Sequence, residues 1–421
     1  MTNSTKSVSY QITIIGILFF IFGFITWANG TLIPYLQIAC QLTDTQAYFV
    51  ATAFFAAYFF MAIPSSFILK AVGFKKGMSL GLFVMAIGAI MFIPAAQNRA
   101  YPLFLTGLFI IGSGLALLQT AANPFVTVLG PIEGAAQRIS IMGICNKIAG
   151  ICAVYLLGSI ALKDADAIKQ KLLTLSEANK NIELDALASR VIEPYTILAA
   201  ILILLSIIIF FINMPDVKEE ETNADTKHTL SKKSVMEFPY LLLGALAIFF
   251  YVGVEVISYD TFTKFGEFLG FKLSIAKNFP TYTGYALLAG YIFNIIAIPK
   301  YFSQQKVLYT FTVLSIILVI LSTFTTGYVA VICFLLLGFS NSVMWPAIWP
   351  LAIEGLGRFT KIGSALLIMG IVGGAILPPL YGKISEIIGN QQVAYLMMIP
   401  AYLYILFFAL KGHKIGKQII A

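Results

Sequence analysis

A small set of polar side chains lies within long apolar stretches of this sequence. Each charged side chain in such a position costs roughly 2.5 to 3.5 kcal/mol to place inside a membrane, so we expect each to have a function. Three of these residues carry a charge, namely Lys147, Glu255 and Asp260. The others are the amides Asn29, Gln119, Asn123, Asn146 and Asn341.

The spacing of these residues places several of them on common helix faces. Gln119 and Asn123 are four positions apart and share one face, and Tyr259 shares another with Glu255. Amides on such faces also form hydrogen bonds between membrane helices, which is the alternative role. Amides combined with flat aromatic rings are typical of a cavity that binds a polyhydroxylated ring. The candidate contacts with such a ligand are Trp27, Asn29, Gln119, Asn123, Asn146, Tyr259, Asn341 and Trp345.

The three charged residues are candidates for moving charge across a membrane. A carboxylate in a partly dry cavity can take up a proton or bind a sodium ion, and Glu255 is the first candidate for this role. Lys147 either supplies a mobile charge or is structural, with its ammonium extended toward the membrane surface. Asp260 lies near the end of its apolar stretch and is either a third coupling group or a solvated rim residue. At 1.5 Å per residue, Lys147 lies about 12 Å and Glu255 about 25 Å from the same side, which argues against a direct ion pair.

Motifs of metalloproteases and of ATP-driven pumps are absent from the sequence. Neither HExxH nor GxxxxGK[ST] occurs, which argues against a metalloprotease and a P-loop ATPase. The string GMSLG at 77–81 matches the GxSxG pattern, but it lies in a predicted membrane helix and not on the strand-to-helix turn that a serine hydrolase needs. The two histidines, His228 and His413, lie outside the apolar stretches, and the four cysteines are dispersed as small apolar residues would be. We therefore expect no enzyme activity, no cofactor and no metal site.

The composition predicts a membrane protein. Of the 421 residues, 59% are hydrophobic and 11% are charged, and the mean hydropathy is +0.90. A membrane-spanning helix needs about 20 apolar residues, and stretches of that length recur along nearly the whole chain. The first of them is too long for the core of a cleavable signal peptide, so we expect it to stay in the mature protein. Breaks at Pro, Gly and charged residues predict twelve helices, near residues 12–36, 46–70, 77–96, 103–127, 139–162, 194–213, 238–262, 280–302, 307–325, 328–351, 361–385 and 392–411.

The two sets of six predicted helices resemble each other. Ile132-Glu133-Gly134, Arg138 and IMGI at 141–144 recur in the same order as Ile353-Glu354-Gly355, Arg358 and IMGI at 368–371. Duplicated halves around a central cavity are typical of secondary transporters. We therefore predict an all-α membrane protein with two pseudo-symmetric six-helix bundles, residues 1–213 and 238–421, joined by a linker at residues 214–237.

The repeated motif carries charges that suit a gate. Arg138 and Arg358 lie at equivalent points of the repeat, near Glu133 and Glu354. We expect these residues to form charge contacts on the cytoplasmic side that stabilise one state of the protein. They are not expected to contact a ligand.

The net charge of +8 is explained by membrane topology. The 27 Lys and Arg residues lie mostly in the gaps between apolar stretches and form no basic stripe, which argues against nucleic acid as a partner. They are more frequent on the side of the N-terminus, so both termini are predicted to be cytoplasmic. The longer segment 163–193 mixes acids with bases and is expected to be solvated, with an amphipathic helix. We predict a multi-pass protein of a bacterial inner membrane, surrounded by lipid.

Several strings of this sequence resemble one family of transporters. FGFIT at 22–26, LIP at 32–34, LQTAANPFVTVLG at 118–130 and FYVGVEV at 250–256 resemble the fucose:proton symporter family of the major facilitator superfamily. LAIEGLG at 351–357 and GGAI at 373–376 are similar to its glucose/galactose transporter branch. The resemblance implies a monomeric twelve-helix importer with alternating access, a monosaccharide substrate, and H⁺ or Na⁺ as the coupling cation. Glucose or galactose is the first choice of substrate, an N-acetylated amino sugar or fucose the alternative, and a proton-coupled drug exporter the alternative of another class.

The chain departs from the fucose symporters at two carboxylates. Where that branch carries an acidic residue and a glutamate, this chain has Gly30 and Gln119. The glucose/galactose branch shares the glutamine and Glu255, but it usually has a serine where this chain has Lys147. Coupling in this chain would therefore use Glu255, Asp260 or Lys147, or be absent.

Overall fold

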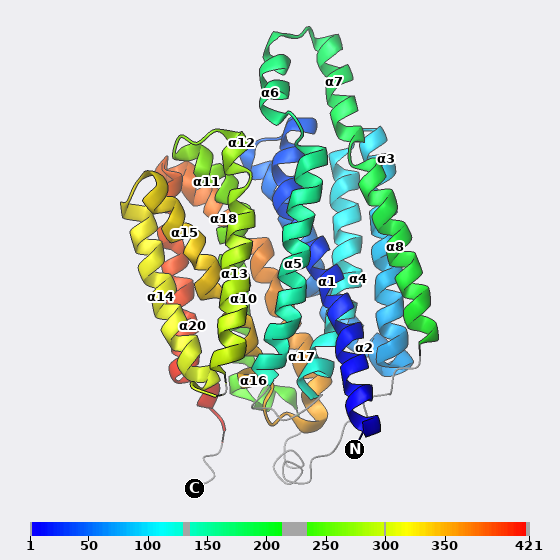
Figure 1. The fold of residues 1–421 in the computed structure, drawn as a ribbon, viewed down its shortest axis with the longest axis vertical. Helices are drawn as coiled ribbons and strands as arrows, with labels where there is room; N and C mark the ends of the chain where they lie inside the picture. Colours follow the sequence, from blue (N-terminus) through cyan, green and yellow to red (C-terminus); the bar gives the residue numbers. More distant parts are fainter. Residues whose placement is uncertain (1, 129–134, 213–233, 299, 418–421) are drawn as a thin grey trace.

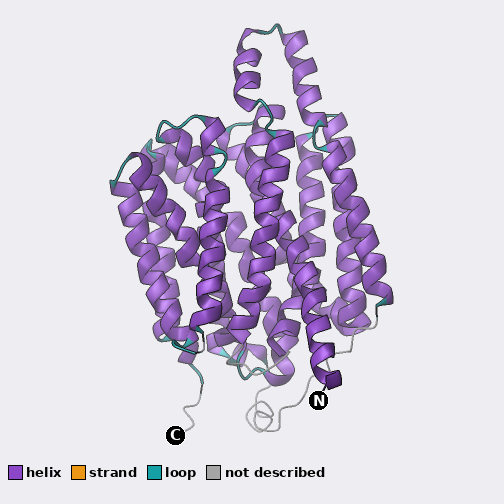
Figure 2. Cartoon of the chain, viewed as in Figure 1, coloured by secondary structure: helices purple, strands orange, loops and turns teal. Residues whose placement is uncertain are grey.

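The computed structural model describes residues 2–128, 135–212, 234–298 and 300–417 as a bundle of helices (Figure 1). Within these ranges all regular secondary structure is helical (Figure 2). The long helices run side by side, and both chain ends lie at one face of the bundle, which we call the terminal face. The opposite face carries two projecting helices, α6 (Ala165–Thr174) and α7 (Glu177–Ser189), and we call it the hairpin face.

One helix of the first half is long enough to cross a membrane twice. The 47 residues of α2 span about 70 Å at 1.5 Å per residue, more than twice a hydrocarbon thickness of about 30 Å. It is broken at Gly73, whose φ of 79° and ψ of 168° are not helical, and the gap predicted between residues 70 and 77 lies at this break. The long helices of this half are α1 (Thr2–Ala39), α2 (Asp44–Ile90) continued by α3 (Phe92–Gln97), α4 (Tyr101–Val128), α5 (Ala135–Ala161) and α8 (Ile192–Phe211).

Several crossings of the second half consist of two or more helical pieces. The break between α15 and α16 lies at residues 342–343, and 3-10 turns interrupt other crossings. The pieces are η2 (Val235–Glu237), α10 (Pro239–Asp260), α11 (Phe262–Phe268), α12 (Leu273–Ala276), α13 (Phe279–Ala297), α14 (Gln304–Phe324), α15 (Gly327–Asn341), α16 (Met344–Ile353), η3 (Gly357–Phe359), α17 (Thr360–Met369), η4 (Gly370–Val372), α18 (Gly373–Ile388), α19 (Gln391–Ala394), η5 (Tyr395–Met397), α20 (Met398–Leu410) and η6 (Gly412–Lys414).

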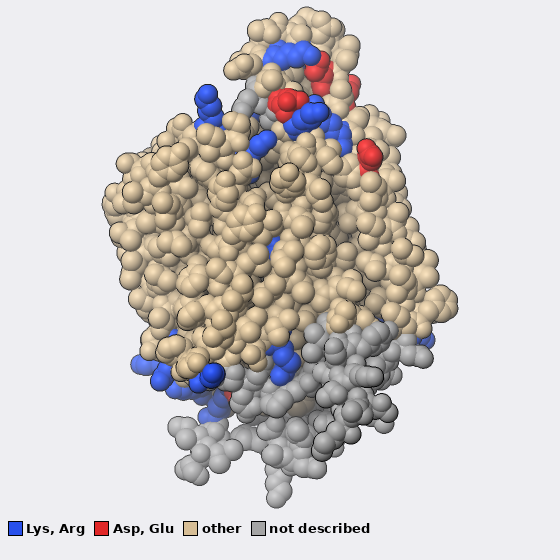
Figure 3. All heavy atoms as spheres, viewed as in Figure 1, with Lys and Arg blue, Asp and Glu red and all other residues tan. Residues whose placement is uncertain are grey.

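The described helices account for twelve membrane crossings. Ten stretches are long and apolar enough to cross, and one of them, Gln46–Gln97, has 52 residues and contains the break at Gly73, so it supplies two crossings. The 19-residue helix α13 packs against α5 and α15 and supplies the twelfth. On the face that Figure 3 shows, a nearly uncharged belt crosses the molecule, while charged side chains gather at its two ends. These features confirm the predicted twelve-helix membrane fold.

Two predictions about the first half need correction. α5 begins at Ala135 instead of residue 139. The segment 163–193 contains two helices, α6 and α7, where one was expected. Asp164 adopts a left-handed φ of 57°, which ends the run of α5 and redirects the chain. Arg99 then ties α7 to the bundle through Asp185 at 3.4 Å and the Asn181 amide oxygen at 2.9 Å.

The two halves of the chain meet along several pairs of helices. α5 packs against α13 and α16, α2 against α17 and α18, and α4 against α17. α1 contacts α10. The helices that carry most of the polar candidates, α1, α4, α5 and α10, therefore lie where the halves meet.

Helices α1 and α5 cross closely at Gly23. A Cβ atom at this position would lie 1.8 Å from the carbonyl oxygen of Asn146. Because non-bonded atoms do not approach so closely, a side chain at position 23 must separate the two helices. Gly158 of α5 differs, since nothing lies within 4 Å of the corresponding Cβ position.

Gly23→Ala should destabilise the folded protein, because the added methyl group forces α1 away from α5. Overpacking of this kind typically costs about 1 to 3 kcal/mol, so we expect a lower melting temperature of the purified protein in detergent. Gly158→Ala adds the same methyl group where there is space and should leave the melting temperature unchanged or slightly higher. Equal melting temperatures for the two variants would contradict this crossing.

Candidate functional site

A cavity lies where the two halves meet, and it contains most of the polar residues that the sequence singles out. Its volume is about 720 Å³, including its opening to solvent. Helices α1, α2, α4 and α5 line it from the first half, and α10, α13, α16 and η4 from the second. The lining residues are Phe19, Phe22, Thr26, Trp27, Phe55, Tyr58, Gln119, Asn123, Ile139, Gly143, Asn146, Lys147, Tyr251, Val252, Glu255, Val256, Tyr291, Trp345 and Ile371.

Trp27 is held between α1 and α5. Its indole Nε1 donates a hydrogen bond to Asn146 Oδ1 at 3.0 Å. Its ring lies against Gly150, where a Cβ atom would come within 2.6 Å of the indole. The Tyr259 ring packs on the indole with centroids 4.2 Å apart. Trp27 and Asn146 thus line the cavity, whereas Tyr259 supports Trp27 from outside the lining.

Lys147 and Glu255 form an ion pair between the two halves. Lys147 Nζ lies 3.1 Å from Glu255 Oε1, and the two side chains are only 5% and 10% exposed. The same Nζ lies 3.5 Å from the centroid of the Trp27 ring, a cation–π distance. The depth estimate that argued against this pair was wrong. Because α5 begins at Ala135, Lys147 lies about 18 Å along its helix and Glu255 about 24 Å along α10, a difference that two long side chains can bridge.

The amides of α4 line the cavity together, as their shared face predicted. Gln119 Nε2 donates a hydrogen bond to the Tyr58 hydroxyl at 3.1 Å, and Asn123 is 2% exposed one turn further along. Tyr58 and Tyr291 also line the cavity, and sequence reasoning missed both. Tyrosines are frequent in this chain, with 20 in all, so nothing in the sequence alone singled out these two.

Asn341 of α15 and Trp345 of α16 were both predicted to contact a ligand, but only Trp345 lines the cavity. Trp345 stacks on Trp349 with ring centroids 5.4 Å apart. Asn341 is buried away from the lining, where its Oδ1 accepts a hydrogen bond from the Tyr402 hydroxyl at 3.0 Å and its Nδ2 donates to Ser258 Oγ at 3.5 Å. This amide therefore joins helices to one another, which was the alternative role for such residues.

Asn29 and Asp260 also lie outside the cavity lining. Asn29 is fully buried in α1, and neither atom of its amide group has a hydrogen-bond partner among the described residues. Asp260 is the last residue of α10 and is 6% exposed. Its Oδ1 faces Gly30 of α1, where a Cβ atom would lie 3.4 Å away. Asp260 is therefore a buried carboxylate at the contact of α1 with α10, and the alternative of a solvated rim residue is wrong.

The structure describes the predicted gate only in part. Arg138 Nε donates a hydrogen bond to the Val126 carbonyl oxygen at 3.0 Å, which joins α5 to α4. Glu354 is exposed and forms an ion pair with Lys417 at 2.5 Å. Glu133 and the side chain of Arg358 lie outside the described residues, so their charge contacts stay predictions.

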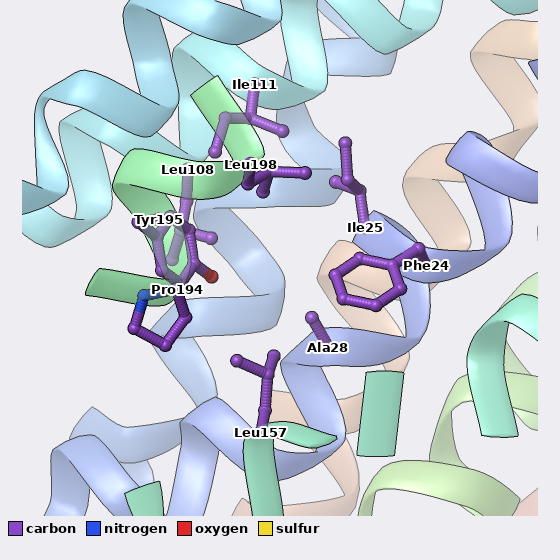
Figure 4. Close-up of a pocket in the computed structure, with 9 residues that line it drawn as sticks. All are labelled: Phe24, Ile25, Ala28, Leu108, Ile111, Leu157, Pro194, Tyr195 and Leu198. Carbon is purple, nitrogen blue, oxygen red and sulfur yellow. The ribbon is translucent and has the colours of Figure 1, made fainter. Parts of the chain in front are cut away.

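A second cavity, of about 390 Å³, lies within the first half between α1, α4, α5 and α8. Nearly all of its lining is hydrocarbon, so it offers little to a polyhydroxylated or charged ligand. The described residues also contain no group of three His, Cys, Asp or Glu side chains that could hold a metal ion. The residues that line this cavity are Phe24, Ile25, Ala28, Leu108, Ile111, Leu157, Pro194, Tyr195 and Leu198 (Figure 4).

Comparison with known proteins places the chain in a family. Residues 15–367 match the Major Facilitator Superfamily. The glucose/galactose transporter of Brucella abortus biovar 1 is 36% identical over 98% of this chain and 96% of its own length. The L-fucose-proton symporter of Escherichia coli K12 is 32% identical over 93% of this chain and 90% of its own length. The crystal structure of the transporter FucP in the outward conformation is similar with a TM-score of 0.78 and 30% identity, covering 98% of this chain and 100% of that chain. These relatives are transporters and not enzymes, and the chain belongs to the major facilitator superfamily.

Proposed function

We propose that this chain is a secondary active transporter that imports a hexose of the glucose or galactose type by alternating access. The relatives named above are sugar transporters, and the similarity to them covers nearly the whole chain. The observation that carries the proposal is the cavity between the halves, with its amides and aromatic rings. L-Fucose or an N-acetylated amino sugar is the alternative substrate, because an L-fucose-proton symporter is among the relatives.

The lining of the cavity suits a sugar ring. Gln119, Asn123 and Asn146 offer donors and acceptors to hydroxyl groups. Trp345 offers a flat apolar face to the C–H side of a pyranose. Trp27 lines the same cavity, with its ring already against Lys147 Nζ and the Tyr259 ring. A buried polar group without a partner costs roughly 1 to 3 kcal/mol. The amides of this lining therefore favour a ligand that has hydroxyl groups on all sides and can bond to them.

The two halves would be the moving parts of this transporter. We assign residues 1–213 and 238–421 to two bundles and residues 214–237 to the linker, most of which lies outside the described residues. Rocking of two bundles around a ligand held between them exposes the ligand to either side in turn. Arg138 and Glu354, together with Arg358 and Glu133, are assigned to the gate of one access state.

The terminal face is assigned to the cytoplasm of a bacterial cell. The chain passes from the hairpin face to the terminal face along the first part of α2 (Figure 1), and Lys70, Lys75 and Lys76 surround the break there. An excess of basic residues in short loops marks the cytoplasmic side. We assign the protein to the inner membrane as a monomer with both termini in the cytoplasm.

The coupling cation, H⁺ or Na⁺, is assigned to Asp260. Among the described residues no Lys, Arg or His lies within ion-pair distance of this carboxylate, whereas Glu255 already has Lys147 at 3.1 Å. A buried carboxylate without a counter-charge is costly, and binding of a cation removes that cost. Glu255, the first candidate from the sequence, would have to exchange Lys147 for a soluble cation.

Proteoliposomes that contain the protein should take up radiolabelled glucose or galactose, and unlabelled hexoses should compete with this uptake. A panel with L-fucose, N-acetylglucosamine and a lipophilic drug, repeated with and without Na⁺, would identify the substrate class and the cation. Empty liposomes are the control. Failure of every sugar in the panel to be transported or to compete would overturn the proposed function.

Gln119→Ala and Asn123→Ala should each weaken sugar binding about 5-fold to 150-fold, because a sugar hydroxyl would lose its partner, which costs roughly 1 to 3 kcal/mol. The measurement is equilibrium binding of the preferred sugar to purified protein. Asn98→Ala removes an exposed amide far from the lining and should bind like the wild type. Wild-type affinity in both cavity variants would remove α4 from the site.

Asp260→Asn should abolish accumulation of sugar against a gradient while preserving exchange of internal for external sugar, because exchange requires no net movement of the coupling cation. Counterflow and gradient-driven uptake in the same proteoliposomes separate the two activities. Asp185→Asn changes an exposed carboxylate of α7 and should accumulate sugar normally. Accumulation by Asp260→Asn, with loss of it in Glu255→Gln, would move the coupling role to Glu255.

A further inference from the structure

The ion pair of Lys147 and Glu255 has the surroundings of a binding site for a monovalent cation. Its anionic group is a buried carboxylate, and its second ligand is the face of an aromatic ring, which attracts cations. Both groups belong to the cavity lining. The cation that occupies this site is covalently part of the chain, since it is the ammonium group of Lys147.

We propose that Lys147 is a tethered counter-cation that fills the cation site of Glu255 and makes this site independent of Na⁺. The statement that sugar uptake needs no Na⁺ at Glu255 rests on the proposed function, whereas the cation site itself does not. Lys147 thus acts as a positioning residue, which holds Glu255 neutralised at the cavity wall without a soluble ion.

The ring that completes the site is fixed before any ligand arrives. Asn146 accepts the indole hydrogen of Trp27 at 3.0 Å, and Tyr259 packs on the same ring at 4.2 Å between centroids. Gly150 leaves room for the indole beside α5. The ring therefore presents its face to Nζ at 3.5 Å.

A soluble cation competes poorly with a tethered one. The ammonium group is covalently attached to α5, next to Asn146, which holds the ring of the site. Its effective concentration at the site therefore far exceeds that of a dissolved ion. The pair is electrically neutral, and a further cation would add an uncompensated charge to a buried position. Na⁺ is therefore expected to bind at Glu255 only after the tethered ammonium is removed.

The experiment removes the tether and supplies the cation from solution. Lys147→Ala keeps Cβ, and n-propylammonium has the three carbons and the ammonium group that this substitution deletes. The readout is the melting temperature of purified protein without sugar, in choline chloride, NaCl or n-propylammonium chloride at equal ionic strength. Every protein compared also carries Asp260→Asn, so that Na⁺ binding at the carboxylate assigned to the coupling cation does not contribute to the melting temperature. In this background we expect equal melting temperatures in all three salts when Lys147 is present, and a lowered value for Lys147→Ala that Na⁺ or n-propylammonium raises.

Two controls show whether the response arises at this site. Lys147→Met with Glu255→Gln removes both charges, so this double variant should melt above Lys147→Ala in choline chloride and show no response to the cations. Lys169→Ala removes the lysine of an exposed ion pair with Glu267, and it should melt like Asp260→Asn alone in every salt. If Lys147→Ala cannot be purified, Lys147→Met replaces it with NaCl as the probe.

Three results would overturn the proposal. One is a wild type whose melting temperature or sugar uptake requires Na⁺ at this site, with the requirement lost in Glu255→Gln. Another is a lysine variant that responds to the cations no more than Lys169→Ala does. The third is a double variant that responds as strongly as Lys147→Ala. Absence of sugar uptake by the wild type would instead contradict the proposed function and leave the melting results as evidence about the site.

Discussion

The hydrocarbon of a membrane offers no partner to a polar side chain, and this constraint arranges the polar groups of the whole bundle. Many hydroxyl groups bond to a carbonyl one turn earlier in their own helix, as Thr261 does with Ile257 at 2.7 Å. Others join two helices, as Ser79 does with the Ser206 carbonyl oxygen at 2.8 Å. A lysine, two carboxylates and several amides cannot be satisfied in these ways alone. Most of them lie where the two halves meet, and there they can face one another or a ligand.

Close packing of helices brings these groups into reach of one another. Gly23 lets α1 approach α5, and Gly150 leaves space for the indole of Trp27 on the same interface. The indole in turn lies over the ammonium of Lys147 and is bonded to Asn146. A change that separates α1 from α5 would therefore alter the cation–π contact, the amide and the shape of the cavity together. Stability of the bundle and chemistry of the site depend on the same contacts.

The membrane class, the twelve crossings and the duplicated pattern could be predicted from the sequence, because length, hydropathy and repetition are local properties. The shared face of Gln119 and Asn123 was equally accessible, since one helix determines it. The pair of Lys147 with Glu255 was not, because it depends on where α5 begins and on the relative height of two helices in different halves. Asn341 shows a second reason why parts of the site could not be predicted from the sequence. A buried amide has the same sequence context whether it faces a ligand or, as here, the Tyr402 hydroxyl of a neighbouring helix.

The two carboxylates of α10 have different partners because of their spacing. Glu255 and Asp260 are five positions apart, which at 3.6 residues per turn places them about 140° apart around the helix and about 7.5 Å apart along it. One consequently faces Lys147 of α5, and the other faces Gly30 of α1. A single helix of the second half thus contacts two helices of the first half through charged groups at two depths. A tilt of α10 can therefore change the contact at Asp260 and the distance from Glu255 to Lys147 together. If a coupling cation binds at Asp260, as proposed, this shared helix would connect that cation mechanically with the site at which a sugar would lie.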